Sequence, residues 1–171
     1  MAERKGLVTM KGNLVTLVGN EIKVGQNAPN FTVVANDLSV VTLDAFKGKK
    51  LIISAVPSLD TSVCDTETKR FSQEAAKLGS DVLVLTISMD LPFAQKRWCG
   101  ANNVTNIKTL SDYKGASFAN AYGVLIQELH LLARAIFVVD SKGKVQYIQL
   151  VKEITTEPNY DEVLAAVRKI S

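Results

Sequence analysis

Two cysteines, Cys64 and Cys99, are the residues of this sequence whose types and setting point most directly to chemistry. In a chain without a recognisable secretory signal, paired cysteines favour redox or metal chemistry over a structural disulfide, because reducing compartments rarely keep such a bond. A metal site is the weaker interpretation, since only His130 could join the two thiols and their separation is not a ligand spacing. No CxxC pair is present either. We therefore expect redox chemistry by two separated thiols, with no metal and no cofactor.

Cys64 follows an apolar run, residues 51–56, and a loop, residues 57–61, and it stands at the start of a helical pattern. Free backbone N–H groups and the positive end of the helix dipole gather in a first turn, and both favour a thiolate over a thiol. Thr61 is close enough in sequence to reach the sulfur or an oxygen bound beside it. Pro57 gives no backbone donor and suits a rigid pocket wall.

Acidic residues near this turn work against a thiolate. Asp60, Asp65 and Glu67 all place negative charge close to the cysteine, so an ionised sulfur needs a nearby cation. Arg134 is the best candidate, because it lies in an apolar stretch, residues 131–137, where a charge needs a specific partner. From the residues alone, the arginine equally fits a structural ion pair, and a lone cysteine near a helix start is more often a small buried hydrophobe than a nucleophile.

The elements that must position these residues alternate between strand and helix patterns. Three almost wholly apolar runs predict strands buried on both faces: 51–56, 82–87 and 135–139. Apolar residues at helical spacing predict a helix from Ser62 to Leu78, ending at Gly79, and a last helix from Asp161 to Ile170. Turn residues predict hairpins between 7–10 and 14–18, between 31–34 and 40–43, and between 135–139 and 144–148. The order predicts an α/β domain with a mixed sheet.

Composition narrows the function classes. The chain has 171 residues, 47% hydrophobic and 22% charged, with a net charge of +3 and no concentrated run of Lys and Arg, so nucleic-acid binding is not expected. No apolar run reaches the 18 residues of a membrane span, and no signal-peptide pattern begins the sequence. A cytoplasmic protein without membrane contact is the expectation.

The loop Pro57-Ser58-Leu59-Asp60-Thr61-Ser62-Val63-Cys64 resembles the active-site loop of a peroxiredoxin, in which Pro, three residues, Thr and two residues precede Cys. Its Ser-Leu-Asp version is similar to the thiol peroxidase subfamily, the atypical two-cysteine peroxiredoxins. The segments 90–99 and 131–135 and the N-terminal hairpin agree with that resemblance, which extends from about residue 7 to the C-terminus.

The resemblance implies a role for each of five residues. Cys64 would be the peroxidatic cysteine, Thr61 and Arg134 would bind the peroxide and hold the thiolate, and Pro57 would shield the sulfur. Cys99 would be the resolving cysteine, closing an intrachain disulfide. The implied fold is thioredoxin-like, a single domain over residues 1–171 with a central mixed sheet flanked by helices and an N-terminal β-hairpin. Implied partners are a hydrogen peroxide or alkyl hydroperoxide substrate, thioredoxin as reductant, and a second copy in a homodimer.

Local structure around Cys99 suits such a role. Asp90 can N-cap a short helix with Pro92 in its first turn, and Cys99 falls near its end beside Gly100. A helix of about nine residues is marginal without packing, so its last turn can fray. We predict that this end and the first turn at Cys64 both loosen before the sulfurs meet, because a disulfide needs Cα atoms about 4.4–6.8 Å apart.

Two other functions fit parts of the sequence. One is a thioredoxin-like binding module whose cysteines are inert, and thiol titration with peroxide would separate it from the enzyme. The other is a cysteine hydrolase using His130, which lacks a recognisable third group to orient the base. We expect His130 to be a surface or edge residue instead.

Overall fold

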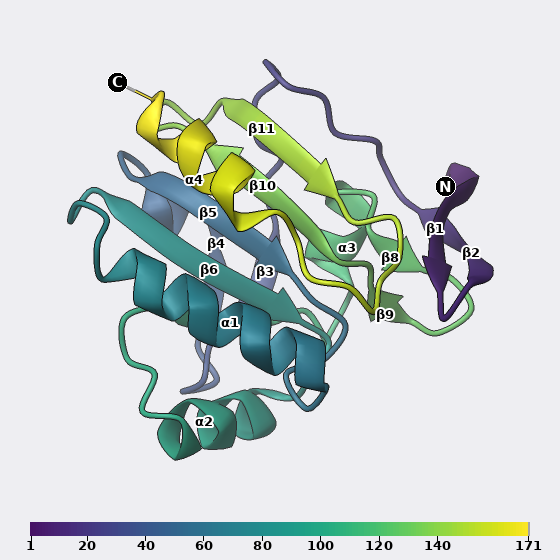
Figure 1. The fold of residues 1–171 in the computed structure, drawn as a ribbon, viewed down its shortest axis with the longest axis horizontal. Coiled ribbons are helices and arrows are strands. Elements are labelled where there is room, and N and C mark those ends of the chain that lie inside the picture. The colour runs from purple at the N-terminus through teal and green to yellow at the C-terminus, as the bar shows by residue number, and fades with distance from the viewer. Residues whose placement is uncertain (171) are drawn as a thin grey trace.

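The computed structural model describes residues 1–170, and its largest element is a mixed β-sheet (Figure 1). Its strands, in spatial order, are β11 (Val145–Leu150), β10 (Ala135–Val139), β5 (Lys50–Ala55), β6 (Val82–Ser88), β7 (Lys108–Ser111), β3 (Thr32–Val34) and β4 (Val40–Thr42). Strands β5, β6 and β7 pair in parallel, and the outer strands pair antiparallel. This arrangement confirms the predicted α/β class with a mixed sheet, and β5 is buried along nearly its whole length as predicted.

Helices cover both faces of the sheet. Helices α1 (Ser62–Ala75) and α4 (Tyr160–Arg168) lie on the front face in Figure 1, and α3 (Ser117–Ala121) lies behind the sheet. Helix α2 (Pro92–Ala101) packs against β7, and a single 3₁₀ turn spans Leu43–Phe46. The connection from β5 through α1 to the parallel strand β6 places the start of α1 at the carboxyl end of the central strand.

The N-terminal hairpin belongs to a second, smaller sheet. Its strands, in spatial order, are β1 (Glu3–Met10), β2 (Asn13–Val18), β8 (Leu125–Ile126) and β9 (Leu131–Leu132). The turn at Lys11 and Gly12 has positive φ at both positions, 51° and 81°, the geometry of a tight two-residue hairpin. The predicted hairpin is confirmed, with a longer first strand than expected.

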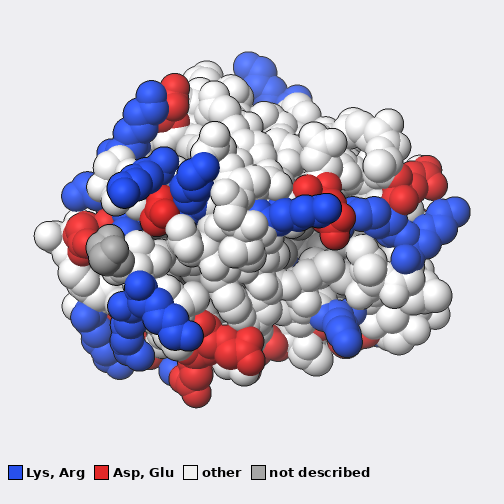
Figure 2. All heavy atoms as spheres, turned by 90° about the horizontal axis from the view of Figure 1, so that it is seen from above, with Lys and Arg blue, Asp and Glu red and all other residues white. Residues whose placement is uncertain are grey.

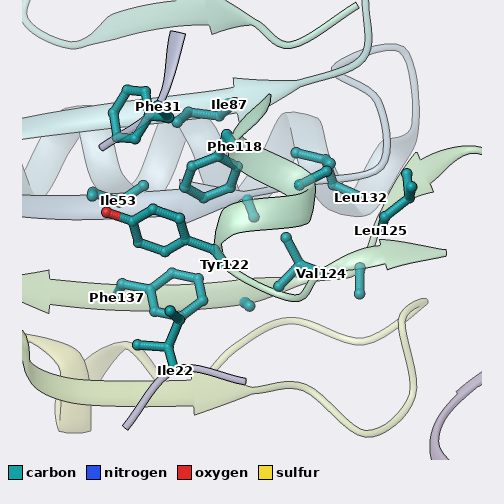
Figure 3. Packing of buried hydrophobic residues seen from close by; sticks show 14 of the residues in the cluster. Ile22, Phe31, Ile53, Ile87, Phe118, Tyr122, Val124, Leu125, Leu132 and Phe137 are labelled. Atoms are coloured by element: carbon teal, nitrogen blue, oxygen red, sulfur yellow. The ribbon is translucent and has the colours of Figure 1, made fainter. Parts of the chain in front are cut away.

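Two apolar clusters fill the two sides of the sheet. The larger holds Phe118 stacked on Tyr122 at 4.4 Å between ring centroids, with Phe137 at 5.0 Å from Tyr122 (Figure 3). The smaller lies under α1 and α4 and includes Cys64, with Cys99 packed at its margin. Alternation along β5 produces this division, because successive side chains of a strand point to opposite faces. Both cysteines therefore adjoin the same apolar layer.

Some predicted helix ends are wrong. Helix α1 ends at Ala75 rather than Leu78, because Lys77 and Leu78 donate to carbonyls three residues back and tighten the chain into turns before Gly79. Helix α4 spans Tyr160–Arg168 rather than 161–170. Sequence periodicity did not reveal the short elements β7, α3, β8 and β9, whose two to five residues carry too little pattern.

Candidate active site

Cys64 lies in the first turn of α1 and has no exposed surface. Thr61 is the N-cap residue of α1. Its backbone is extended, with φ −102° and ψ 145°, and its side chain accepts no hydrogen bond from the first turn. The carbonyl of Thr61 accepts from the backbone N–H of Asp65 at 2.9 Å, which closes the first helical bond. The N–H groups of the first turn, which carries Cys64, are thus left without a side-chain cap.

Arg134 is the cation beside Cys64, as predicted from the sequence. It lies between β9 and β10, only 1% of its surface is exposed, and its Nη2 donates to Cys64 Sγ at 3.3 Å. Its Nε donates to the carbonyl of Ile154 at 2.9 Å, and its Nη1 contacts Glu67 Oε2. Because a guanidinium is planar, contacts in three directions fix both its position and the direction of its bond to sulfur.

Glu67 is the buried partner of Arg134 and also accepts from Ser54 Oγ at 2.9 Å. Burial raises the pKa of the Glu67 carboxyl, and Arg134 and Ser54 oppose that rise. Burial lowers the pKa of Arg134, but the negative charges of Glu67 and Cys64 outweigh it and raise that pKa above its ordinary value. The guanidinium therefore stays charged beside the sulfur. Glu67, read from sequence only as opposing charge, is instead paired with the cation.

The loop before α1 is held by Asp90. Its Oδ1 accepts from Ser58 Oγ at 2.6 Å, and its Oδ2 accepts from the N–H of Leu59 at 2.8 Å and from Ser88 Oγ at 2.7 Å. The prediction that Asp90 caps the next helix is wrong: Leu91 is the N-cap of α2, with no side-chain bond. The Asp90 carboxylate binds the loop rather than the helix because three donors, from the loop and from β6, lie within hydrogen-bonding distance of it.

Pro57 and Thr61 lie at the two ends of this loop. Pro57 is buried beside the end of β5. Thr61 is exposed, and its hydroxyl donates to the carbonyl of Ser58 at 2.8 Å rather than to the sulfur. The structure therefore places Thr61 at an exposed position three residues before Cys64, with its hydroxyl engaged in the loop.

Cys99 lies in the last turn of α2 and is half-buried. Its sulfur is 3.4 Å from Thr109 Oγ1, whose hydroxyl donates to Asn36 Oδ1 at 3.1 Å. Both cysteines are free within residues 1–170. The two sulfurs thus have different partners in this structure, Arg134 for Cys64 and a strand hydroxyl for Cys99.

His130 and the charged surface lie outside this arrangement. His130 is exposed, in a tight turn between β8 and β9 with φ 52°, as expected for an edge residue. On the face shown in Figure 2, Lys and Arg side chains are interspersed with Asp and Glu. Among the described residues no cluster of three His, Cys, Asp or Glu side chains could hold a metal ion. A helix long and apolar enough to cross a membrane is likewise not found in residues 1–170.

Two features of the site were not predicted from the sequence: the role of Glu67 as the partner of Arg134, and the contact between Arg134 and the Ile154 carbonyl. Glu67 stands three residues after Cys64, a spacing that puts both on one side of a helix, and this signal could have identified it. The Ile154 carbonyl carries no sequence signal, since it is a backbone group. In chemical terms, the buried sulfur faces a fixed cation at the start of a helix. This is the setting that stabilises a thiolate and makes it nucleophilic.

Comparison with known proteins agrees with this chemistry. The redoxin family model matches residues 23–164. The thiol peroxidase of Halalkalibacterium halodurans is 56% identical over 161 residues, covering 94% of this chain and 96% of the relative. That of Bacillus subtilis is 55% identical over 163 residues, covering 95% and 97%. A peroxiredoxin-like protein from Aquifex aeolicus superposes with a TM-score of 0.89 at 48% identity, covering 96% of this chain and 98% of that structure.

The family match spans most of the chain, and it includes the loop, the helix and the arginine that form the site. The fold comparison agrees with the predicted thioredoxin-like architecture. The chain therefore belongs to the redoxin family and, within it, to the thiol peroxidases, peroxiredoxin-type enzymes that reduce peroxides.

Proposed function

We propose that Cys64 is the peroxidatic cysteine and Cys99 the resolving cysteine of this thiol peroxidase. The observation that carries the proposal is the 3.3 Å contact between Arg134 Nη2 and Cys64 Sγ in a buried site at a helix start. In the first step the Cys64 thiolate attacks one oxygen of a hydroperoxide, an S–O bond forms and the O–O bond breaks. The other oxygen leaves as hydroxide or alkoxide and takes up a proton, so the products are a sulfenic acid and water or an alcohol.

Charge moves from sulfur to the leaving oxygen in this step, so donors along that line stabilise the transition state more than the ground state. Arg134 supplies a fixed, charged donor, and the uncapped N–H groups of the first turn of α1 supply neutral ones. Thr61 is proposed to donate to the peroxide after its hydroxyl turns from the Ser58 carbonyl. Pro57, buried at the other end of the loop, is proposed to form the wall that keeps other reductants from the sulfur.

In the second step the Cys99 thiol attacks the Cys64 sulfenic acid, which forms the disulfide and releases water. The separate partners of the two sulfurs support the prediction that the first turn of α1 and the last turn of α2 loosen before this bond forms. A dithiol reductant then returns both cysteines to thiols and is itself oxidised to a disulfide. We propose thioredoxin for that role, with the protein in the cytoplasm.

We also propose that the enzyme is a homodimer with the active-site loop near the interface. Two apolar side chains at the start of α2, beside this loop, are exposed: Leu91 at 52% and Phe93 at 66%. Sedimentation equilibrium of the parent and of Phe93→Asp tests this assignment. A monomeric parent, or an unchanged dimer in the variant, argues against an interface at this position.

Thiol counting after one equivalent of peroxide tests the cysteine roles. The parent is expected to lose both thiols without an intermolecular crosslink on a non-reducing gel. Cys99→Ser should lose one thiol and accumulate a sulfenic acid that dimedone traps, whereas Cys64→Ser should consume no peroxide. Peroxide consumption by Cys64→Ser at the parent rate would contradict the proposal, and unchanged thiols in the parent would favour an inert thioredoxin-like binding module.

A further inference from the structure

Glu153 joins the N-terminal hairpin to the segment that follows β11. Its Oε1 accepts from the backbone N–H of Lys11 at 2.8 Å, and its Oε2 accepts from that of Gly12 at 3.1 Å and from the hydroxyl of Thr9. The hydroxyl and the backbone N–H of Thr155 donate to Oε1 at 2.6 and 3.3 Å. One carboxylate thus accepts from five donors in two segments far apart in sequence, including both residues of the hairpin turn.

Backbone bonds on each side of Glu153 complete this connection. The N–H of Thr9 donates to the carbonyl of Lys152 at 2.7 Å, and the N–H of Ile154 donates to the carbonyl of Thr9 at 2.9 Å. Ile154 is 1% exposed, so its backbone sits in the packed interior. Thr9 therefore determines where the peptide groups around Glu153 lie.

The same segment holds Arg134 at two points. The carbonyl of Ile154 accepts from Arg134 Nε at 2.9 Å, and the N–H of Val151 donates to the carbonyl of Arg134 at 3.0 Å. Because the guanidinium is planar, the Ile154 carbonyl, together with Glu67, sets the direction in which Nη2 donates to Cys64 Sγ. A shift of that carbonyl turns the donor away from the sulfur.

We propose that Glu153 is a positioning residue for Arg134: it binds the hairpin turn to the segment around Ile154 and so fixes the guanidinium that donates to Cys64. The inference rests on the proposed role of Arg134 in peroxide reduction. It makes the N-terminal hairpin part of the framework of the active site. Thr9, Lys11 and Gly12 nevertheless lie outside residues 23–164, the part of the chain that the redoxin family model matches.

The geometry requires a carboxylate at this position. Two oxygens without protons can accept from all five donors, whereas a glutamine amide offers one accepting oxygen and turns two N–H donors toward other donors. Glu153→Gln therefore removes the connection with almost no change in side-chain volume. The variant changes neither Arg134, Glu67 nor Cys64.

Glu128 is a matched control, because it is another carboxylate that binds the N-terminal hairpin from a different segment. Both of its carboxylate oxygens accept from the N–H of Thr16 in β2 at 3.0 Å, and Glu128 lies in the turn between β8 and β9. Glu128→Gln thus weakens the attachment of the second hairpin strand and leaves the segment around Ile154 intact. Thr9→Val, which removes one donor to Glu153, is a milder variant of the proposed connection.

The experiment measures the single-turnover rate with peroxide by stopped flow and the pH dependence of Cys64 alkylation, each in a Cys99→Ser background. Glu153→Gln is expected to slow the peroxide step about tenfold or more and to move the alkylation profile to higher pH. Thr9→Val should shift both in the same direction by less, and Glu128→Gln should match the parent. A purely structural role would lower unfolding stability without moving the alkylation profile.

Arg134→Lys, measured in parallel, distinguishes failure of the positioning role of Glu153 from failure of the proposed role of Arg134. A slow Arg134→Lys with a parent-like Glu153→Gln overturns the positioning role of Glu153 alone. Equal slowing by Glu153→Gln and Glu128→Gln also overturns it, because general loosening of the hairpin would then be the cause. A parent-like Arg134→Lys shows that the assigned role of Arg134 itself is wrong.

Discussion

The indole Nε1 of Trp98 donates a 2.9 Å hydrogen bond to Asp65 Oδ1. Asp65 directly follows Cys64 and Trp98 directly precedes Cys99, so this bond joins the first turn of α1 to the last turn of α2. Under the proposed mechanism both turns loosen before the two sulfurs meet, and this bond would then oppose that step.

Asp65→Ala should accelerate disulfide formation, because the bond that must break before Cys99 reaches Cys64 is absent. A hydrogen bond to a charged acceptor contributes about 1.5–3 kcal/mol, so the second kinetic phase should quicken by about tenfold or more while the peroxide step changes little. Trp98 is the only tryptophan, and its fluorescence reports both phases in one stopped-flow trace. Lys69→Ala, which removes the other partner of Asp65, is the control. An unchanged second phase in Asp65→Ala would argue against this role.

Asp90→Ala should impair peroxide reduction without removing any group that touches the sulfur. The carboxylate holds Ser58 and the N–H of Leu59, so its loss frees the loop that carries Pro57 and Thr61. A misplacement of about 1 Å in such a loop can cost up to about 100-fold in rate. Single-turnover kinetics at several peroxide concentrations check this expectation. Parent-like rates in a folded variant would show that the loop keeps its shape unaided.

Arg134→Ala should destabilise the fold as well as slow the reaction. The variant leaves the Glu67 carboxylate buried without its cation, and breaking a buried pair in this way costs about 3–5 kcal/mol. Adding Glu67→Gln should recover part of that loss, because the uncompensated charge is removed. Urea unfolding of the parent, the two single variants and the double variant measures the coupling. Additive effects would contradict a direct pair.

Acid should weaken the attachment of the hairpin through Glu153. Hydrogen bonds from Thr155 and Thr9 lower the pKa of Glu153 to about 2 from its ordinary 4.5. A depressed carboxyl pKa stabilises the fold fully above the unfolded value, and that contribution is lost as pH falls from about 4.5 toward 2. The difference in unfolding free energy between parent and Glu153→Gln should be constant above pH 5 and shrink below it. A difference independent of pH would contradict the ionised contact.

The sequence was most informative where the relevant residues are neighbours in the chain. The loop before Cys64 and the start of its helix were predicted because Pro57, Thr61 and Cys64 lie within one short segment. Arg134 was assigned from a physical need, since a buried charge requires a partner. Its pairing with Glu67 depends on tertiary packing between distant segments, which residue types alone do not determine.

Asp90, which was predicted to cap α2, shows why side-chain partners are harder to predict than secondary structure. Asp90 has the type and spacing of a helix cap, but its carboxylate can serve any donor within reach. In the folded chain, Ser58 and Leu59 supply donors from a segment about thirty residues earlier, and they take the carboxylate instead. Sequence patterns indicate which hydrogen bonds Asp90 could make. The pairing of β5 with β6 determines which of them it makes, because it brings Ser58 and Leu59 next to Asp90.

Alkylation of Cys64 by iodoacetamide as a function of pH, in a Cys99→Ser background, tests the central claim most directly. If the contact with Arg134 holds the sulfur as a thiolate, the rate should already be at its plateau at pH 7, and Arg134→Lys should move the rise to higher pH. A parent profile that still climbs through about pH 8.5, as for a free cysteine, would contradict the account.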